Sequence, residues 1–189
     1  MGEYYSVMYN DVDLYKREMT AEETRATEEL RQELISICDS LEVPRGKLYD
    51  GSPYMGRLKD NEDFCLKYSN EFGYYVLFGE RGTFELMDGF PTRDREKAKY
   101  LLLKGEFSSG GFIYELNNRN NLHTEWGKKY TAEYDSRKAA FEYIIKILRT
   151  VFHRMPEDCI AEYTMFMNKW FSDDHWYFDR DSMTFEESA

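Results

Sequence analysis

The sequence lacks the residue patterns on which metal, nucleophile and phosphate chemistry depend. It has only three histidines and three cysteines, and none of them shows the His-x-x-x-His or Cys-x-x-Cys spacing that begins a metal site. It has no Gly-x-Ser-x-Gly elbow and no glycine-rich phosphate loop. These absences argue against a metalloenzyme, a serine hydrolase and a nucleotide-binding enzyme, and we expect neither enzymatic activity nor a cofactor.

Long apolar runs are also missing. No stretch reaches the roughly 18 apolar residues that would span a bilayer, so we expect no membrane insertion. Residues 1–13 are polar and acidic, without the basic and apolar regions of a signal peptide. The cysteines are odd in number and widely spaced, which argues against a disulfide framework: Cys38, Cys65 and Cys159. The sequence therefore predicts a reduced, cytoplasmic protein.

The charge is strongly negative and unevenly distributed. The net charge is −11, with 19 acids and 10 bases in residues 1–92 and 9 acids and 2 bases in residues 157–189. Residues 93–154 are basic, with 13 bases and 8 acids, but acids interrupt the lysines as on a solvated helix face. This balance disfavours nucleic acid as a partner and favours a basic protein, although it also serves solubility.

Local patterns predict helices at both ends of the chain. Thr20 and Glu23 have the spacing of a capping box, and the apolar stripe that follows reaches Leu41 before Pro44 ends the helix. A last helix begins near Pro156, and an acidic, aromatic tail follows from about residue 172.

The region between them mixes strands and helices. Residues 64–68, 73–78 and 83–87 are rich in β-favouring residues and are separated by turn residues, which predicts a three-stranded antiparallel meander. A helix follows from Thr92 to about Gly105.

Further along, a Gly-Ser loop over residues 108–111 and a short helix over residues 112–119 are expected. Next come an exposed insertion over residues 120–134 and a central apolar helix capped by Asp135 or Ser136. We therefore predict one α+β domain over residues 1–189, in which a small antiparallel β-meander of three or more strands packs with four to five helices.

One group of charged residues stands out ahead of the central helix. Glu115 and Arg119 are four residues apart and share a helix face, and Asp135 and Arg137 lie at the start of the next helix. A cation at a helix N-terminus is unfavourable unless an acid compensates it. We interpret the four residues as a structural ion network that ties two helices together; direct contact with a partner is the alternative.

These residues also carry a family resemblance. The chain resembles the immunity proteins of bacterial polymorphic toxin systems, specifically the family numbered 63, over about residues 64–150. The resemblance rests on four motifs: Glu80-Arg81-Gly82, Tyr100-Leu101-Leu102, Glu115-Leu116 with Arg119, and Asp135-x-Arg137 with Phe141. It implies a non-enzymatic cytoplasmic protein that binds and occludes a cognate toxin domain. A regulatory or anti-defence adaptor that binds a host protein is the alternative, and a hydrolase with a carboxylate site is a third.

The contact surface for such a partner is expected in the C-terminal tail, because acids and rigid aromatic rings suit a basic protein surface. The predicted binding residues are Trp170, Asp173, Asp174, Trp176, Tyr177, Asp179 and Asp181. An alternative surface is the predicted insertion, with Asn120, Asn121, His123, Trp126 and Tyr130.

Overall fold

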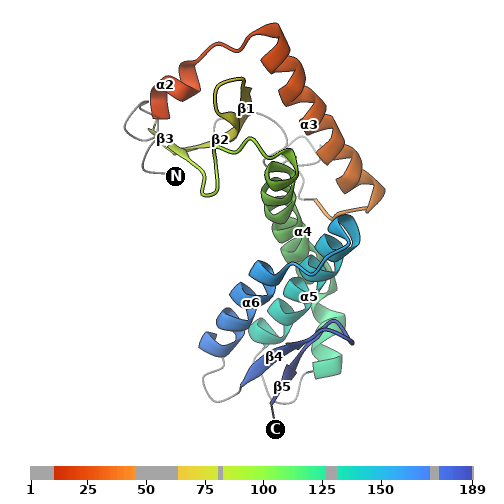
Figure 1. Cartoon of the computed structure of the whole chain (residues 1–189). Helices are drawn as coiled ribbons and strands as arrows, with labels where there is room; N and C mark the ends of the chain where they lie inside the picture. The colour runs from red at the N-terminus through yellow and green to blue at the C-terminus, as the bar shows by residue number, and fades with distance from the viewer. Residues whose placement is uncertain (1–10, 46–63, 81–82, 127–131, 171–174, 189) are drawn as a thin grey trace. The chain divides into compact units, whose positions relative to one another are not determined.

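The computed structural model describes residues 11–45, 64–80, 83–126, 132–170 and 175–188 (Figure 1). Contacts divide the chain into two compact units. Unit 1 comprises residues 1–42 and 52–106, and unit 2 comprises residues 43–51 and 107–189. The mixed α+β class is confirmed, with an antiparallel three-stranded sheet and a separate two-stranded sheet. A single domain over the whole chain stays a prediction, because compact units can belong to one folding domain.

Unit 1 begins with α2 (Asp11–Lys16) and α3 (Ala21–Ser40). The predicted capping box is confirmed: the Glu23 N–H donates to the Thr20 Oγ1 at 3.3 Å, and the Thr20 N–H donates to the Glu23 carboxylate at 2.9 Å. These two bonds satisfy backbone donors that the first turn of a helix leaves unpaired. The apolar face of α3 is fully buried: Leu30, Leu34 and Cys38.

The sheet of unit 1 is the predicted meander. β1 (Phe64–Ser69), β2 (Gly73–Glu80) and β3 (Thr83–Leu86) pair antiparallel in the order β1-β2-β3. The middle of β2 is no more than 1% exposed on three successive residues, Tyr75, Val76 and Leu77. Because successive side chains point to opposite faces, both faces of β2 are covered, which explains its nearly continuous apolar sequence.

The predicted helix start at Thr92 is wrong, because Thr92 extends the sheet and the helix begins at Arg95. The Thr92 N–H donates to the Tyr74 carbonyl at 2.9 Å and the Thr92 carbonyl accepts from the Tyr74 N–H at 2.8 Å. Gly73 precedes this contact with a φ of +86°, and a Cβ there would collide with the Thr92 carbonyl oxygen. The helix N-cap is Asp94, whose carboxylate accepts the Lys97 N–H at 3.1 Å.

A single helix, α4 (Arg95–Trp126), replaces the predicted sequence of helix, Gly-Ser loop, short helix and insertion. The loop prediction was wrong because the small residues serve helix packing. A Cβ at Gly111 would lie 2.6 Å from the Ile144 Cγ1, and one at Gly110 would lie 2.6 Å from the Val43 Cγ1. Both neighbours belong to unit 2, so tertiary contact outweighs the low helix propensity of glycine here.

The core of unit 2 is the pair of helices α5 (Ala132–Phe152) and α6 (Glu157–Trp170). The ring of Phe141 stacks on the ring of Tyr163 with centroids 4.2 Å apart. The predicted apolar face of α5 is confirmed by fully buried Ile144, Ile145 and Leu148. The helix begins at Ala132, so Asp135 lies inside it and does not cap it, and Arg137 lies beyond the first turn.

The C-terminal segment forms a β-hairpin where the sequence suggested a tail from about residue 172. β4 (Trp176–Asp179) pairs antiparallel with β5 (Thr184–Glu187), and α6 contacts β4 while α5 contacts β5 (Figure 1). Trp176, Phe178 and Phe185 are at most 8% exposed. Burial of three large rings supplies the free energy that orders this segment.

Two helix side chains cover backbone groups on the outer edges of the hairpin. The Asn168 amide of α6 accepts the Trp176 N–H at 2.7 Å and donates to the Trp176 carbonyl at 3.0 Å. On the other edge, the Glu142 carboxylate of α5 accepts the Phe185 N–H at 2.8 Å. A two-stranded sheet is marginal alone, so these bonds and the buried rings fix its position on the helices.

Glu142 is a carboxylate in an apolar core. Its residue is 7% exposed, and burial raises its pKa above the ordinary value of 4.5 despite the bond from Phe185. Lys138 lies 3.7 Å from the carboxylate and 5.7 Å from the centroid of the Trp176 ring. The cluster therefore connects one turn of α5 to both strands of the hairpin.

Replacing Glu142 with alanine should leave the buried Phe185 N–H without its acceptor. The expected cost is about 1–3 kcal/mol in the free energy of unfolding, measured by urea denaturation. Glu142→Gln retains an acceptor oxygen and should cost less at low pH. Equal stability of wild type and Glu142→Ala would show that this bond does not hold the hairpin.

The same carboxylate should impose a pH dependence. Because burial raises the folded-state pKa of Glu142, the folded state binds this proton more tightly than the unfolded state. The stability of the wild type should therefore fall, relative to Glu142→Gln, as the pH rises from about 4.5 through the folded-state pKa. Parallel stability curves for the two proteins across this range would contradict the raised pKa.

Candidate functional site

The hairpin presents one face away from the core. Along β4 and β5 the residues that alternate with the buried rings are Tyr177, Asp179, Thr184 and Glu186, which we name the outer hairpin face. Tyr177 is 49% exposed and stands opposite Glu186 across the strands, and Asp179 stands opposite Thr184. An exposed aromatic ring is thus placed beside carboxylates on a regular strand pair.

Hydrogen bonds order the polar groups of this face and of its turn. The Thr184 hydroxyl donates to the Glu186 carboxylate at 2.6 Å. The Asp179 carboxylate accepts the N–H of Asp181 at 2.8 Å, and this bond is the main cause of its lowered pKa. Asp179 is therefore ionised at neutral pH and fixes the turn, while Asp181 is exposed at its tip.

Buried side chains and contacts with the helices support the face from behind. Its opposite side packs the buried rings, and the turn residue Arg180 pairs with Glu157 at the start of α6 at 2.6 Å. Both side chains of that pair are more than half exposed, so the pair itself adds little to stability. The buried rings and the edge contacts hold the outer hairpin face in place.

The structure brings together only part of the predicted binding set. Tyr177, Asp179 and Asp181 lie close in the hairpin, where Tyr177 and Asp181 are exposed and Asp179 is half-buried. Trp176 is wrong as a surface anchor, because its residue is 7% exposed and its ring packs inward. The side chain of Trp170 and the residues Asp173 and Asp174 lie outside the described residues, so their role stays a prediction.

Sequence reasoning missed Glu186. The alternation of apolar and polar residues in Trp-Tyr-Phe-Asp, matched by Thr-Phe-Glu-Glu, is the strand signal that would have placed Glu186 opposite Tyr177. The prediction of a solvated tail included neither the pairing of β4 with β5 nor the burial of alternate aromatic rings.

The predicted ion network is partly described. Glu115 is 3% exposed and Arg137 is half-buried, which agrees with a structural role inside unit 2. The side chains of Arg119 and Asp135 lie outside the described part, so pairing among the four residues stays a prediction.

The predicted loop conformation of the alternative surface is wrong over residues 120–126, whose backbone belongs to α4, while contact of this segment with a partner stays a prediction. This part includes Asn120, Asn121, His123 and Trp126, whose side chains are not described. Tyr130 lies outside the described residues.

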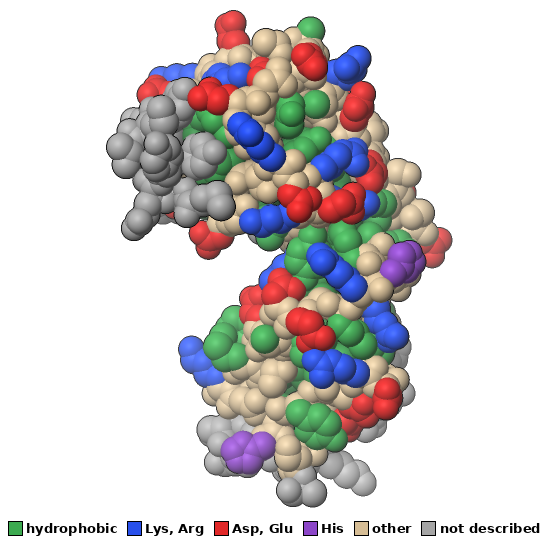
Figure 2. All heavy atoms as spheres, viewed as in Figure 1, with side chains coloured by type: hydrophobic (Ala, Val, Ile, Leu, Met, Phe, Trp, Pro, Cys, Tyr) green, Lys and Arg blue, Asp and Glu red, His purple; other side chains and the backbone are tan. Residues whose placement is uncertain are grey.

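The surface shows no single extended acidic face in the view of Figure 2. Acidic and basic side chains are interspersed there, with hydrophobic side chains exposed between them. The large exposed apolar residues among those described are Phe78, Phe112, Leu116, Met165 and Tyr177. Within the described hairpin the charged residues are four acids and one base: Asp179, Asp181, Glu186, Glu187 and Arg180.

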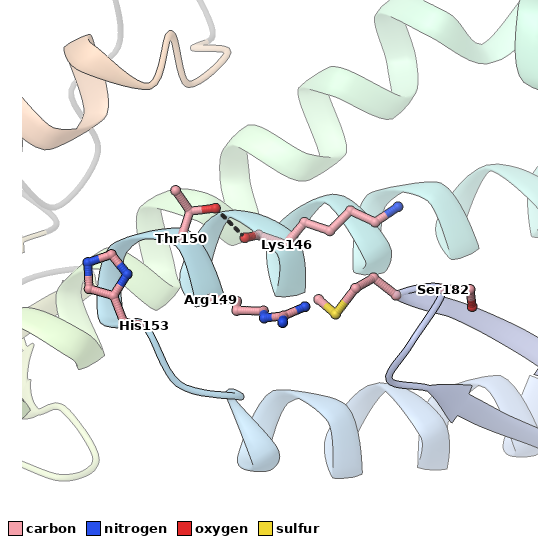
Figure 3. Close-up of a pocket in the computed structure, with 6 residues that line it drawn as sticks. Lys146, Arg149, Thr150, His153 and Ser182 are labelled. Atoms are coloured by element: carbon pink, nitrogen blue, oxygen red, sulfur yellow. Dashed lines mark hydrogen bonds between the residues drawn. The ribbon is translucent and has the colours of Figure 1, made fainter.

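A groove of about 630 Å³ lies in unit 2, at the C-terminal end of α5 (Figure 3). Two elements form it: the last turns of the helix and the turn of the hairpin. Its lining residues are Lys146, Arg149, Thr150, His153, Ser182 and Met183.

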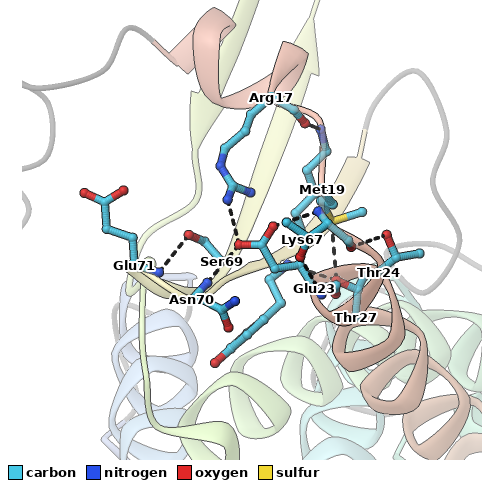
Figure 4. Close-up of polar contacts among 11 residues, drawn as sticks. Arg17, Met19, Glu23, Thr24, Thr27, Lys67, Ser69, Asn70 and Glu71 are labelled. Atoms are coloured by element: carbon cyan, nitrogen blue, oxygen red, sulfur yellow. Dashed lines mark hydrogen bonds and ion pairs between the residues drawn. The ribbon is translucent and has the colours of Figure 1, made fainter.

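A second polar cluster lies in unit 1, around Glu23 (Figure 4). This carboxylate belongs to a residue that is 1% exposed, and it accepts from the Arg17 guanidinium at 2.6 Å and from the Asn70 N–H at 3.0 Å. The bond from Arg17 is the main cause that lowers the pKa of Glu23 to about 2. Because this carboxylate of α3 accepts bonds from the preceding segment and from the β1–β2 turn, we assign it a structural role.

Neither metal binding nor membrane crossing finds support among the described residues. No group of three or more His, Cys, Asp or Glu side chains in that part is arranged to hold a metal ion. No helix there has the length and apolar character needed to cross a membrane. The three thiols are free and buried.

Glu23 should produce a steep acid dependence of stability. Its folded-state pKa of about 2 lies below the ordinary value of 4.5, so its stabilisation is present above pH 4.5 and is lost as the pH falls toward 2. The shift corresponds to about 3 kcal/mol. Glu23→Gln should lack this loss in acid denaturation curves, whereas the exposed control Glu29→Gln should retain it. A wild-type-like acid transition in Glu23→Gln would contradict the assignment.

Comparison of the chain with protein-family models, curated proteins and solved structures gave no match. Membership of the immunity family therefore stays a prediction from the sequence motifs.

Proposed function

We propose that this chain is a cytoplasmic immunity protein that neutralises a cognate toxin domain by binding and occluding it, without catalysing a reaction. The proposal extends the family resemblance to a specific surface, the outer hairpin face with the turn residue Asp181. The single observation that carries it is Tyr177, an aromatic ring that is 49% exposed beside Glu186 on a strand pair anchored in the core.

The chemistry of this face suits a basic partner. Tyrosine offers a large, rigid contact area with a polar hydroxyl, which is typical of residues that dominate binding energy at interfaces. The surrounding carboxylates attract a positively charged surface and speed its encounter at low salt. Toxins that act on nucleic acids carry basic clefts for phosphate, so an acidic face with a central aromatic ring is a suitable obstruction.

The packed support behind this face adds to its suitability. Since the hairpin is already ordered by buried rings and by contacts with α5 and α6, binding need not pay for folding it. Edge contacts also keep the strands from pairing with other chains, which leaves side chains as the recognition elements.

The proposal is tested first by capture. The tagged full-length chain is expressed in its native cells and captured at low and moderate salt, and bound proteins are identified by mass spectrometry. We expect a stoichiometric partner that is the C-terminal domain of a large secreted protein and that is toxic when produced alone. A partner without toxicity would instead favour the adaptor, and no partner at either salt would count against the proposed face.

Substitutions then locate the contact on the purified complex. Tyr177→Ala and Asp181→Lys should each weaken binding at least about tenfold, or about 1.4 kcal/mol, because each removes or reverses a central contact. The matched controls Phe78→Ala and Asp88→Lys change an exposed ring and an exposed turn acid in unit 1 and should bind normally. Isothermal titration calorimetry measures the affinities, and urea denaturation confirms equal stability. Wild-type affinity in both hairpin variants would place the contact elsewhere.

A further inference from the structure

The groove at the end of α5 combines a hollow with basic side chains in an acidic protein. Its volume of about 630 Å³ lies in the range of small-molecule sites. Figure 3 shows the Arg149 side chain extending from α5 toward the turn that carries Ser182, with His153 at the end of the helix. The groove and the outer hairpin face share no residue, although the Ser182 hydroxyl of the groove lies 2.6 Å from the Thr184 hydroxyl of that face, and the inference below does not require the proposed function.

Its basic side chains gather on one side of the helix. Arg149 lies three residues after Lys146, so these two residues share a helix face. His153 lies four residues after Arg149 and follows the same face beyond the end of the helix. All three are exposed. The segment 137–154 holds five Lys and Arg residues and one acid, although acids exceed bases by 11 over the whole chain.

The side chains of these three residues take part in no hydrogen bond or ion pair within the described part of the chain, and Lys146 acts on Glu142 only through space. Several other bases in the described part of the chain are paired with acids. Glu33, for example, lies 2.6 Å from Arg95 and 3.0 Å from Lys99. An acid-rich chain that leaves basic groups unpaired around one hollow provides a place for a negative charge from outside.

The helix end alone does not account for this arrangement. Cations in the last turn of a helix offset its dipole, which explains Arg149. Lys146 lies before the last turn of α5, where that effect has faded. The helix dipole therefore explains the position of Arg149 and does not explain that of Lys146.

The backbone at the groove is also unusual. Among described residues other than glycine, positive φ angles occur at Glu42, His153 and Met183. Two of these, His153 at 51° and Met183 at 60°, line the groove from opposite elements. His153 adopts this conformation directly after α5 and Met183 adopts it in the hairpin turn, so the groove lies where two chain segments reverse direction.

We propose that this groove binds the phosphate group of a small phosphorylated molecule. The planar guanidinium of Arg149 matches two phosphate oxygens, and the ammonium of Lys146 adds a second charge. Ser182 lines the facing wall with its hydroxyl bonded to the Thr184 hydroxyl at 2.6 Å, and Met183 is a buried apolar residue beside it. A phosphate attached to a small organic body meets both the charged and the apolar parts of this lining.

The test uses the full-length chain and inorganic pyrophosphate as the probe. Backbone amide NMR spectra are recorded during a titration at constant ionic strength, with chloride replaced by pyrophosphate. We expect saturating shifts confined to the end of α5 and the hairpin turn. The double variant Lys146→Gln/Arg149→Gln should bind at least about tenfold more weakly, as expected from the loss of two charge-assisted contacts.

The control variant loses the same charge elsewhere. Lys97→Gln/Lys169→Gln replaces two exposed lysines outside the groove and should bind pyrophosphate like the wild type. Circular dichroism and thermal melting confirm that both variants fold, and Arg149→Lys alone serves if the double variant does not. Non-saturating shifts, shifts scattered over other basic residues, or unchanged binding in the groove variant would overturn the proposal. Binding of a glutamate-rich peptide without binding of pyrophosphate would overturn it too.

Discussion

The hydrogen bond from the Phe185 N–H to the buried Glu142 carboxylate is the contact on which the C-terminal half of unit 2 depends. A carboxylate in an apolar core is costly, and here it is tolerated because it satisfies a strand donor and has Lys138 nearby. Since α5 provides the carboxylate and β5 provides the donor, the bond fixes the height of the hairpin on the helix. The positions of the outer hairpin face and of the groove residues Ser182 and Met183 both depend on where the hairpin lies on the helix.

The hairpin illustrates how a short strand pair becomes a stable platform. Its inner side is built from large rings, and its edges are covered by a carboxylate on one side and an amide on the other. The polar and charged residues that alternate with these rings lie on the other side, the outer hairpin face. One segment thus contributes to the core through every second residue and to recognition through the residues between them.

Local signals in the sequence predicted much of the fold. The capping box at Thr20, the meander of β1 to β3 and the apolar face of α5 depend on short-range patterns, and all three are present. The continuous α4 was not predictable in this way, because Gly110 and Gly111 read as a loop until their packing against Val43 and Ile144 is known. That contact joins residues far apart in the sequence, where propensity carries no information.

The candidate site was predicted in the same uneven way. The acidic and aromatic composition of the C-terminal segment indicated the region that forms the hairpin, where Tyr177 and Asp181 are exposed and Asp179 is half-buried; a contact with a partner there stays a prediction. Composition does not give direction, however, and Trp176 points inward because the strand alternates its side chains. The groove could not be predicted, because it forms where the hairpin turn lies beside the end of α5. No local sequence pattern indicates such a long-range contact.

The burial of the three cysteines gives each unit its own chemical reporter. Cys38 and Cys65 lie in the core of unit 1 and Cys159 lies in the core of unit 2, all at most 7% exposed. A thiol reagent can modify such groups only when the surrounding structure opens, so the rate of labelling at each cysteine follows the opening of its own unit. The native sequence therefore allows the cooperativity between the two units to be read by mass spectrometry, without any engineered label.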